Sequence, residues 1–341
     1  MRVIHILNTD KYSGAENVVI NIIKELKNEV DSFYVSLKGP IEKILDEQGI
    51  QYIPIKELSI SEINRVIKEY KPDIMHAHDF RASITCARSN FKGKIISHIH
   101  QTPMFLRTWN LKSLIYYLSI SRYYKIIGVT DFIIKQCIFS KKMMPKYETI
   151  CNCINKEKIL EKAKEEEQKK YDIAFLGRLE PVKNPIRFLS IVNNVIKKEP
   201  KLRVVIIGDG TLRADCEKYI NMNNIAEYVE FRGFVDNPFP IIKNTKIVAL
   251  TSEWEGIPMS ILECGALKKP ILNNGVGGLN EIFNEINYLI CKSNEEYEDK
   301  IIQLLNNKEL YKECENKIEI NMKKFFDVDN YNERIKKIYN E

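Results

Sequence analysis

Short runs of β-branched and other apolar residues alternate with amphipathic stretches over most of the chain. Residues 3–7 form the first such run, and after a loop over residues 8–16 the stretch 17–26 has helical periodicity. Because alternating strands and helices form a parallel sheet covered by helices on both faces, the sequence predicts an α/β fold. Further strands are expected over residues 32–36, 52–55, 74–77, 94–99, 173–176, 203–207, 229–231, 247–251 and 270–272, and further helices over residues 41–48, 61–70, 83–89, 185–198, 212–221, 259–266 and 295–325.

The length of 341 residues is about twice that of a usual domain, and the alternation is interrupted once. Residues 155–171 are rich in Lys and Glu and almost free of aromatic side chains, which is typical of a solvated linker. We therefore expect two Rossmann-like domains, over residues 1–160 and 161–325, that face a central cleft. A C-terminal helix over residues 326–341 is expected to pack back on the first domain. Ligands of such sheets bind at the carboxyl ends of the strands, so the loops there are expected to line the cleft.

Composition and charge narrow the classes of function. The chain has 52 Lys and Arg against 46 Asp and Glu, and this net charge of only +6 does not indicate a nucleic-acid partner. Eight cysteines without a Cys-x-x-Cys pair fit a reducing compartment. The sequence shows neither a signal peptide nor the about 20 consecutive apolar residues that cross a bilayer. We expect a cytoplasmic protein.

The second half of the chain carries cations directly after an expected strand. Gly177 and Arg178 follow the strand, and Lys183 comes five residues later. An arginine fork and a lysine point charge together suit a diphosphate, although two surface cations at a strand end explain the pattern equally well. Gly208 closes the next strand as part of a tight turn with available backbone amides.

The segment from Ser252 to Glu263 is the most informative in the chain. It places Glu255 in a loop after a strand and Glu263 about one turn inside the following helix. A carboxylate accepts two hydroxyls at once, as recognition of a sugar ring or a ribose requires. The helix start near Pro258 is a second site for an anion. Glu263 as a solvated surface carboxylate is the alternative, but its neighbours in the sequence are apolar or small.

In order and spacing, these motifs resemble those of glycosyltransferase family four, a retaining GT-B family that transfers a sugar from a nucleotide diphosphate sugar to an acceptor. The resemblance covers nearly the whole chain. The motifs that carry it are Gly14-Ala15-Glu16, Gly177-Arg178-Leu179 with Lys183-Asn184-Pro185, Gly208-Asp209-Gly210, Glu255 and Glu263 with Gly256 and Pro258, Gly265, Pro270, and Gly277-Gly278 with Glu281.

The resemblance implies a donor site in the second half of the chain. Arg178 and Lys183 would hold the diphosphate, Glu263 would bind the ribose hydroxyls, and Glu255 would contact the donor sugar. The fixed cations would stabilise the leaving diphosphate without a metal or another cofactor. Further donor-binding positions are Gly14, Gly208, Gly256, Ile257, Pro258, Met259 and Ser260.

Histidines after two expected strands are candidates for the reacting centre. By the resemblance, His100 lies near the reacting sugar and completes a catalytic set with Glu255, Arg178 and Lys183. His78 is a cleft-lining alternative, although a histidine in such a place is often only a structural hydrogen-bonding group. Glu16 and Gln101 are further candidates on the acceptor side.

No metal site is expected. The Asp-x-Asp at Asp327 and Asp329 stands near the start of the last helix, where capping explains it better than metal binding. Residues 104–147 carry eight Lys and Arg against one acid, interleaved with aromatic residues. This pattern is typical either of docking on an anionic membrane surface or of an ordinary helix that covers a sheet.

The sequence therefore predicts a retaining glycosyltransferase that moves a hexose or N-acetylhexosamine from a UDP-sugar to a glycan acceptor. The resemblance implies a polyprenyl-diphosphate-linked acceptor, bacterial surface polysaccharide synthesis, and peripheral attachment to the inner face of the cell membrane. Two alternatives stay open: a nucleotide-sugar epimerase of GT-B fold, and a catalytically silent GT-B subunit that activates a partner.

Overall fold

The computed structural model describes residues 1–101 and 104–341 and divides into two compact units. Unit 1 consists of Met1–Cys153 together with Val328–Glu341, and unit 2 is Ile154–Asp327. The chain passes into unit 2 earlier than residue 160 because the expected linker folds into α8 (Lys156–Lys162), which packs against helices of unit 2. Asn237 Nδ2 donates to the carbonyl of Lys162 at 3.0 Å, which fixes the end of α8 there.

Unit 1 is built on a seven-stranded parallel sheet of order β3-β2-β1-β4-β5-β6-β7. The sequence analysis placed the first five strands within two residues and missed β6 and β7. Both missed strands are short and lie in or beside the basic, aromatic segment that resembles a surface helix. The strands are β1 (Arg2–Ile6), β2 (Asp31–Leu37), β3 (Tyr52–Ile55), β4 (Ile74–Ala77), β5 (Lys94–Ile99), β6 (Lys125–Gly128) and β7 (Tyr147–Thr149).

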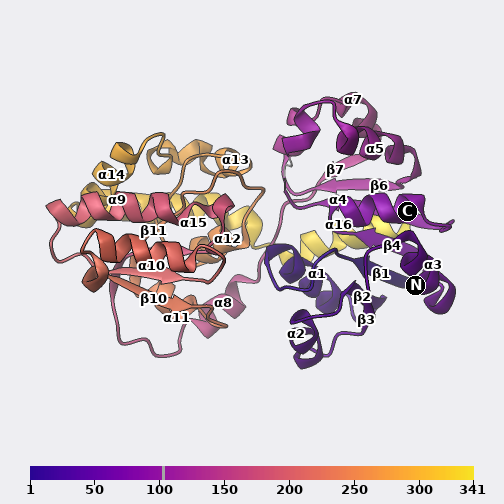
Figure 1. Cartoon of the computed structure of the whole chain (residues 1–341), viewed down its shortest axis with the longest axis horizontal. Coiled ribbons are helices and arrows are strands. Elements are labelled where there is room, and N and C mark those ends of the chain that lie inside the picture. Colours follow the sequence, from indigo (N-terminus) through magenta and orange to yellow (C-terminus); the bar gives the residue numbers. More distant parts are fainter. Residues whose placement is uncertain (102–103) are drawn as a thin grey trace. The chain divides into compact units, whose positions relative to one another are not determined.

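Helices cover both faces of this sheet (Figure 1). On one face, Ile4, Met75 and Ile95 pack in a core with residues of α3, α4 and α5. On the other face, Leu7 and Tyr34 pack against α1 and α2. The α-helices of the unit are α1 (Gly14–Glu25), α2 (Ile41–Glu47), α3 (Ile60–Tyr70), α4 (Phe80–Arg88), α5 (Leu111–Ser119), α6 (Asp131–Gln136), α7 (Ser140–Met143) and α16 (Val328–Asn340).

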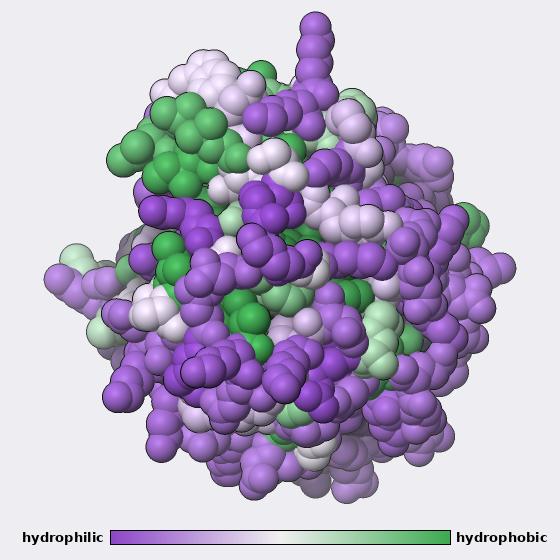
Figure 2. Space-filling model, turned by 90° about the vertical axis from the view of Figure 1, so that its right-hand side faces the viewer, coloured by the Kyte–Doolittle hydropathy of each residue, from purple (hydrophilic) through white to green (hydrophobic). Residues whose placement is uncertain are grey.

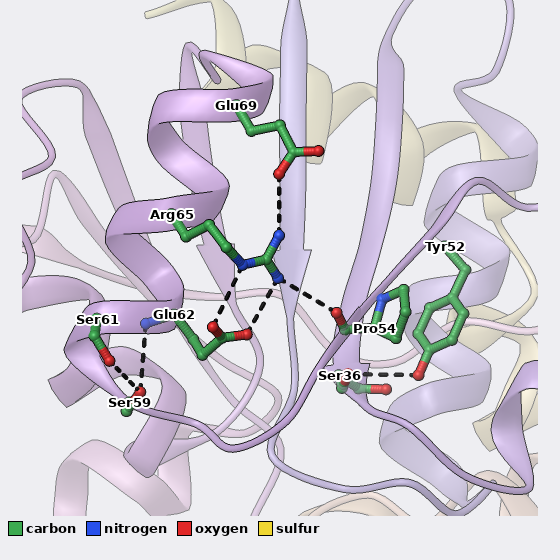
Figure 3. A network of polar contacts seen from close by, with 8 residues as sticks. All are labelled: Ser36, Tyr52, Pro54, Ser59, Ser61, Glu62, Arg65 and Glu69. Atoms are coloured by element: carbon green, nitrogen blue, oxygen red, sulfur yellow. Dashed lines mark hydrogen bonds and ion pairs between the residues drawn. The ribbon is translucent and has the colours of Figure 1, made fainter.

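Polar contacts fix α3 beside the edge strand β3 (Figure 3). The hydroxyl of Ser59 accepts from the backbone N–H of Glu62 at 3.3 Å and caps the helix. Arg65, one turn later, forms ion pairs with Glu62 and Glu69 and reaches the carbonyl of Pro54 in β3 at 3.5 Å. The cap and the ion pairs thus stabilise α3 itself, and Arg65 joins the helix to β3.

The C-terminal helix α16 belongs to unit 1, where Figure 1 shows it in yellow among elements from the start of the chain. Tyr339 and His76 share a hydrogen bond of 2.7 Å between the phenol oxygen and Nδ1. Arg334 donates to a carboxylate oxygen of Glu148 at 2.9 Å. Asp329 lies in the first turn of α16, where the helix dipole favours a carboxylate.

Unit 2 contains a five-stranded parallel sheet of order β10-β9-β8-β11-β12. Its central strands are buried on both faces, as expected for a parallel sheet between helices. The expected helix over residues 295–325 is divided at Asn307, whose side chain accepts from Leu310 N at 3.0 Å and starts a new helix. The strands are β8 (Tyr171–Leu176), β9 (Val204–Ile207), β10 (Val229–Gly233), β11 (Thr245–Ala249) and β12 (Ile271–Leu272), and the helices besides α8 are α9 (Pro185–Lys198), α10 (Arg213–Met222), α11 (Phe239–Lys243), α12 (Met259–Ala266), α13 (Leu279–Phe283), α14 (Asn294–Asn306) and α15 (Lys308–Met322).

In the part of the chain that the structure describes, no helix combines the length and the apolar character that crossing a membrane requires.

Candidate functional site

Loops at the carboxyl ends of the strands in unit 2 are joined by backbone hydrogen bonds. Leu179 N, after β8, donates to Asp209 O, after β9, at 2.9 Å. Glu253 N, after β11, donates to Val182 O at 2.8 Å. Gly278 N, after β12, donates to Glu255 O at 3.4 Å. The loops after β8, β9, β11 and β12 therefore lie side by side, and we call them together the rim of unit 2.

Two glycines allow this close approach of backbones. Gly208 has a φ of +137°, and a Cβ there would collide with the carbonyl of Gly177. Gly277 has a φ of +61°, and a Cβ there would collide with the carbonyl of Glu255. Any other residue at either position would both strain the backbone and push the loops apart.

Lys183 and Glu255, 72 residues apart in the sequence, form an ion pair on this rim. Lys183 Nζ lies 2.5 Å from Glu255 Oε1, and the side chains are only 14% and 9% exposed. The next residue, Asn184, has a left-handed backbone with a φ of 48° and caps α9 by accepting from Arg187 N. Its Nδ2 also donates to Glu253 Oε1 at 2.6 Å. Lys183 is therefore held by a local turn that is itself bonded to the loop of Glu255.

Arg178 lies on the same rim, two residues after β8, and differs from Lys183 in its surroundings. Its side chain is exposed and forms no ion pair or hydrogen bond with any residue in the described ranges. The structure thus brings Lys183 and Glu255 into contact but leaves the Arg178 guanidinium available to a ligand.

The helix α12 starts at Met259, as the sequence predicts, with Pro258 at its N-cap. The side chain of Pro258 does not cap the first amides, so the backbone around Ser260 presents donors at a positive dipole end. Glu263 lies one turn inside the helix and is half-buried. Burial raises the pKa of the Glu263 carboxyl to about 7, against a weaker opposite effect of Lys162. Within the described chain the carboxyl group of Glu263 has no hydrogen-bond partner, so it can accept a bond from a hydroxyl or, when protonated, donate one.

The first loop of unit 1 is shorter than the sequence analysis predicted. The helix α1 begins at Gly14 and not at residue 17, because Ser13 Oγ bonds to the carboxylate of Glu16 and closes the first turn. The Ser-x-x-Glu spacing of a helix start is the signal that would have located this boundary. Glu16 is only 2% exposed, so its carboxylate faces the protein interior. Gln101, the other acceptor-side candidate, is exposed.

His78 and His100 meet in unit 1 and are joined by three further histidines. His78 Nδ1 lies 3.1 Å from His100 Nε2, and His5 Nδ1 lies 3.0 Å from His78 Nε2. Next to them, His76 Nε2 lies 3.2 Å from His98 Nδ1. Burial lowers the pKa of His5 and of His100 to about 3 and places the pKa values of the other three well below the ordinary value. All five rings are therefore neutral near pH 7.

The sequence analysis did not assign His5 and His98 to this cluster. Both lie inside strands, at positions where burial is expected and where function is less often sought. Their alternation with apolar residues shows that they share a face with His76 and His78 once β1, β4 and β5 are known to be neighbours.

Two family models match the two halves of the chain. The model for "Glycosyl transferases group 1" matches residues 156–320, and the model for "Glycosyl transferase 4-like" matches residues 12–133. The chain belongs to the group 1 glycosyl transferases. The predicted family and the predicted enzyme class, a glycosyltransferase, are thereby confirmed.

This glycosyltransferase has relatives that align over almost its entire length. The capsular polysaccharide biosynthesis glycosyltransferase CapH of Staphylococcus aureus is 23% identical, and the alignment covers 99% of this chain and 98% of the relative. A UDP-Gal:alpha-D-GlcNAc-diphosphoundecaprenol alpha-1,3-galactosyltransferase of Escherichia coli is also 23% identical, over 93% of this chain and 92% of the relative.

Solved structures confirm the predicted GT-B fold of two parallel α/β domains. The crystal structure of Anabaena Alr3699/HepE in complex with UDP superposes with a TM-score of 0.85 at 15% identity and covers 99% of both chains. A TarM structure from S. aureus in complex with UDP superposes with a TM-score of 0.78 at 14% identity and covers both chains completely.

Proposed function

We propose that this glycosyltransferase moves a hexose or N-acetylhexosamine from a UDP-sugar to a glycan acceptor and retains the anomeric configuration. The nearly full-length relatives named for capsule synthesis and for a diphosphoundecaprenol-linked acceptor support a polyprenyl-diphosphate-linked glycan of the bacterial surface as the acceptor. The structures of HepE with UDP and with UDP-glucose support a uridine nucleotide as the donor.

The observation that carries the donor site is the arrangement of Lys183, Glu255 and Arg178 on one rim of unit 2. In this proposal, Arg178 binds the diphosphate with its free guanidinium fork. The ammonium group of Lys183 has three N–H donors, so it can bind the same phosphates while it keeps a contact with Glu255. Glu255, whose carboxylate contacts Lys183 through one oxygen, binds the hydroxyls of the donor sugar. The pair therefore keeps both side chains in place before the donor arrives.

The remaining donor contacts follow from the neighbouring elements. Glu263, one turn inside α12, binds the ribose hydroxyls, and the backbone from Gly256 to Ser260 binds the sugar and phosphate at the helix start. Gly208 lets the loop after β9 lie close to the nucleotide. Gly14, at the start of α1, is proposed to approach the donor phosphate from unit 1.

Bond cleavage places negative charge on the departing diphosphate and positive charge on the sugar ring. In this proposal, Lys183 and Arg178 stabilise this charge separation when they face the leaving group, an effect of about 3–4 kcal/mol per well-placed donor. The acceptor then attacks the face from which the diphosphate leaves. We propose that His100 lies at the reacting sugar and that His78 and Gln101 belong to the acceptor side. Glu16, being buried, acts there by holding the first turn of α1.

A surface of unit 1 fits the proposed attachment to the inner face of the membrane. We name it the apolar patch and define it by Met104, Trp109, Leu111, Leu114, Leu118 and Met144, which are between 44% and 72% exposed. Figure 2 shows apolar side chains gathered at the upper edge, the height at which Figure 1 places α5 and α7. Lys112 and Lys141, also exposed, add positive charge beside it.

Flotation with vesicles of anionic lipid tests the apolar patch. We expect binding at low salt that weakens as salt rises, and several-fold weaker binding of a Leu111→Ser/Leu118→Ser variant. A matched variant, Met222→Ser, alters an equally exposed apolar side chain in unit 2 and is expected to bind as the wild type does. Absence of binding of the wild type at low salt would remove the membrane part of the proposal.

A thermal-shift screen of UDP-, GDP- and ADP-sugars tests the donor. A ligand at 100 times its dissociation constant stabilises the protein by about 2.7 kcal/mol, so a bound donor raises the unfolding temperature measurably. We expect a shift with a UDP-sugar, and no shift with any of the compounds contradicts the proposal. Release of UDP and a changed sugar without any acceptor would favour an epimerase, and binding without turnover in the presence of acceptors would favour a silent subunit.

A further inference from the structure

All five histidines of the chain lie on one face of three adjacent strands in unit 1. His5 in β1 is directly opposite His76 in β4, and the next strand in the sheet, β5, contributes His98. His78 and His100 follow at the ends of β4 and β5. The other face of the same strands is an apolar core. The imidazoles are thus gathered on the face opposite this core.

Three of these rings have the arrangement of a metal site. His98 lies in β5 and His100 directly follows this strand, two residues on and on the same side, while His78 directly follows the adjacent strand β4. One ring nitrogen of each lies within 4.8 Å of one ring nitrogen of the other two. We propose that His78, His98 and His100 form a three-nitrogen site for a divalent transition metal of the Zn²⁺ type, with the fourth position left to water or another ligand.

The hydrogen bonds around these rings support the assignment. His98 Nδ1 is bonded to His76, whose other nitrogen is held by Tyr339, so His98 keeps Nε2 for a ligand. That Nε2 and His100 Nδ1 are buried and have no hydrogen-bond partner among the described residues. His78 Nε2 is bonded to His5. Partners of this kind on the second nitrogens of His78 and His98 fix the orientation of these two rings, as metal-binding histidines require.

The distance between His78 and His100 also fits an ion. Their facing nitrogens lie 3.1 Å apart, at hydrogen-bond distance, so the proton of one ring lies between them. Two nitrogens bound to one tetrahedral Zn²⁺ at about 2.0 Å lie about 3.3 Å apart, so the ion replaces this proton with little movement.

The alternative group of His5, His76 and His78 is less suitable. Its nitrogens also lie within 4.8 Å of one another, but all three rings are fully buried. His100 is half-buried, so only the group that contains it offers an ion a route from solvent. If His100 lies at the reacting sugar, a consequence that rests on the proposed function, metal binding inhibits sugar transfer.

Titration of the tag-free protein with Co²⁺ tests the site without any measurement of activity. We expect one bound ion per chain, with the visible absorption of tetrahedral Co²⁺ and without the ultraviolet band of a thiolate ligand, and displacement of the Co²⁺ by Zn²⁺. A His98→Gln variant should bind at least about 100-fold more weakly. Because His98 is buried, the variant is first checked for a native circular dichroism spectrum.

A pair of variants on α16 keeps the test decisive if His98→Gln does not fold. Tyr339→Phe removes the partner of His76 and should weaken binding about tenfold, whereas Tyr331→Phe removes a buried hydroxyl that has no hydrogen-bond partner within residues 1–101 and 104–341 and should not. Cys151 and Cys153 are partly exposed free cysteines outside the proposed site, so Cys151→Ser/Cys153→Ser should also bind Co²⁺ like the wild type. No bound Co²⁺ in the folded wild type, a thiolate band, or equal affinity of Tyr339→Phe and Tyr331→Phe would overturn the proposal.

Discussion

The two units place polar groups at the carboxyl ends of their strands in opposite ways. Unit 1 gathers five histidines, all without charge near pH 7, of which four are buried and His100 is half-buried. Unit 2 has no histidine and uses charges, which are either paired, as Lys183 with Glu255, or exposed, as Arg178. A buried neutral imidazole needs only hydrogen-bond partners, whereas a buried charged group also needs an opposite charge nearby. The comparison therefore predicts different sensitivities for the two units.

The largest difference in stability between the two units is expected at acidic pH. The pKa of the buried histidines is lowered, that of His5 and His100 from 6.5 to about 3, so the unfolded chain binds their protons more tightly than the folded chain. The free energy of unfolding is therefore unaffected by these groups above pH 6.5 and decreases as the pH falls from 6.5 towards 3, because the unfolded chain takes up the protons. One group with this shift corresponds to about 5 kcal/mol, so we expect a loss of at least that size in unit 1 over this interval.

Hydrogen exchange followed by mass spectrometry, corrected for intrinsic exchange rates, measures this loss unit by unit. Peptides of β1, β4 and β5 should lose protection at a higher pH than those of β8 and β9. Loss of protection in unit 2 first would contradict the comparison, because unit 2 carries no buried histidine.

Lys183→Met should reveal the cost of an unpaired charge in unit 2. The substitution leaves the Glu255 carboxylate, on a side chain that is 9% exposed, without its cation and should destabilise unit 2 by about 3 kcal/mol. Chemical denaturation read by hydrogen exchange in β8 and β11 measures the change. The double variant Lys183→Met/Glu255→Leu should regain most of the loss. Equal stability of the wild type and Lys183→Met would show that the ion pair does not hold the rim.

Glu263 gives unit 2 one titrating group in the neutral range, and Glu263→Gln removes it. The carboxyl pKa of Glu263 is raised to about 7, so the folded protein holds this proton more tightly and stability falls as the pH rises from about 4.5 to 7. The variant should lack this fall, which is on the order of 2 kcal/mol. Glu285→Gln, at an exposed position, is the control and should retain it. Parallel pH profiles of the wild type and Glu263→Gln would refute the assignment.

The smallest effect is expected from Tyr339→Phe. Its hydroxyl bonds to His76 at 2.7 Å, and its removal leaves a buried ring nitrogen without that partner, at a cost of about 1–2 kcal/mol to unit 1. Thermal unfolding monitored by near-ultraviolet circular dichroism measures it. Tyr331→Phe on the same helix, whose buried hydroxyl has no hydrogen-bond partner in the described part of the chain, should cost nothing. A larger loss in Tyr331→Phe than in Tyr339→Phe would contradict this view of the cluster.

Local patterns predicted much of the fold. The helices α9 and α12 begin and end where their Pro residues and apolar periodicity place them. The strands β6 and β7 were missed because their type depends on pairing with β5 and with each other rather than on their own four and three residues.

Long-range contacts were the part that sequence alone did not supply. Motif order brought Lys183 and Glu255 to one unit, but the ion pair between them depends on the backbone bond from Glu253 to Val182, which no local pattern contains. In the same way, the positions of His5 and His98 in the histidine cluster follow from the strand order β1-β4-β5, which local sequence patterns do not contain.

Calorimetric titration of UDP and uridine tests the donor site most directly. Arg178→Ala removes one charge-assisted contact to the diphosphate and should weaken UDP binding by about 10- to 100-fold. Uridine, which has no phosphate, should bind the variant and the wild type equally. Failure of the wild type to bind UDP, or equal UDP affinity in wild type and Arg178→Ala, would contradict a donor diphosphate on the rim of unit 2.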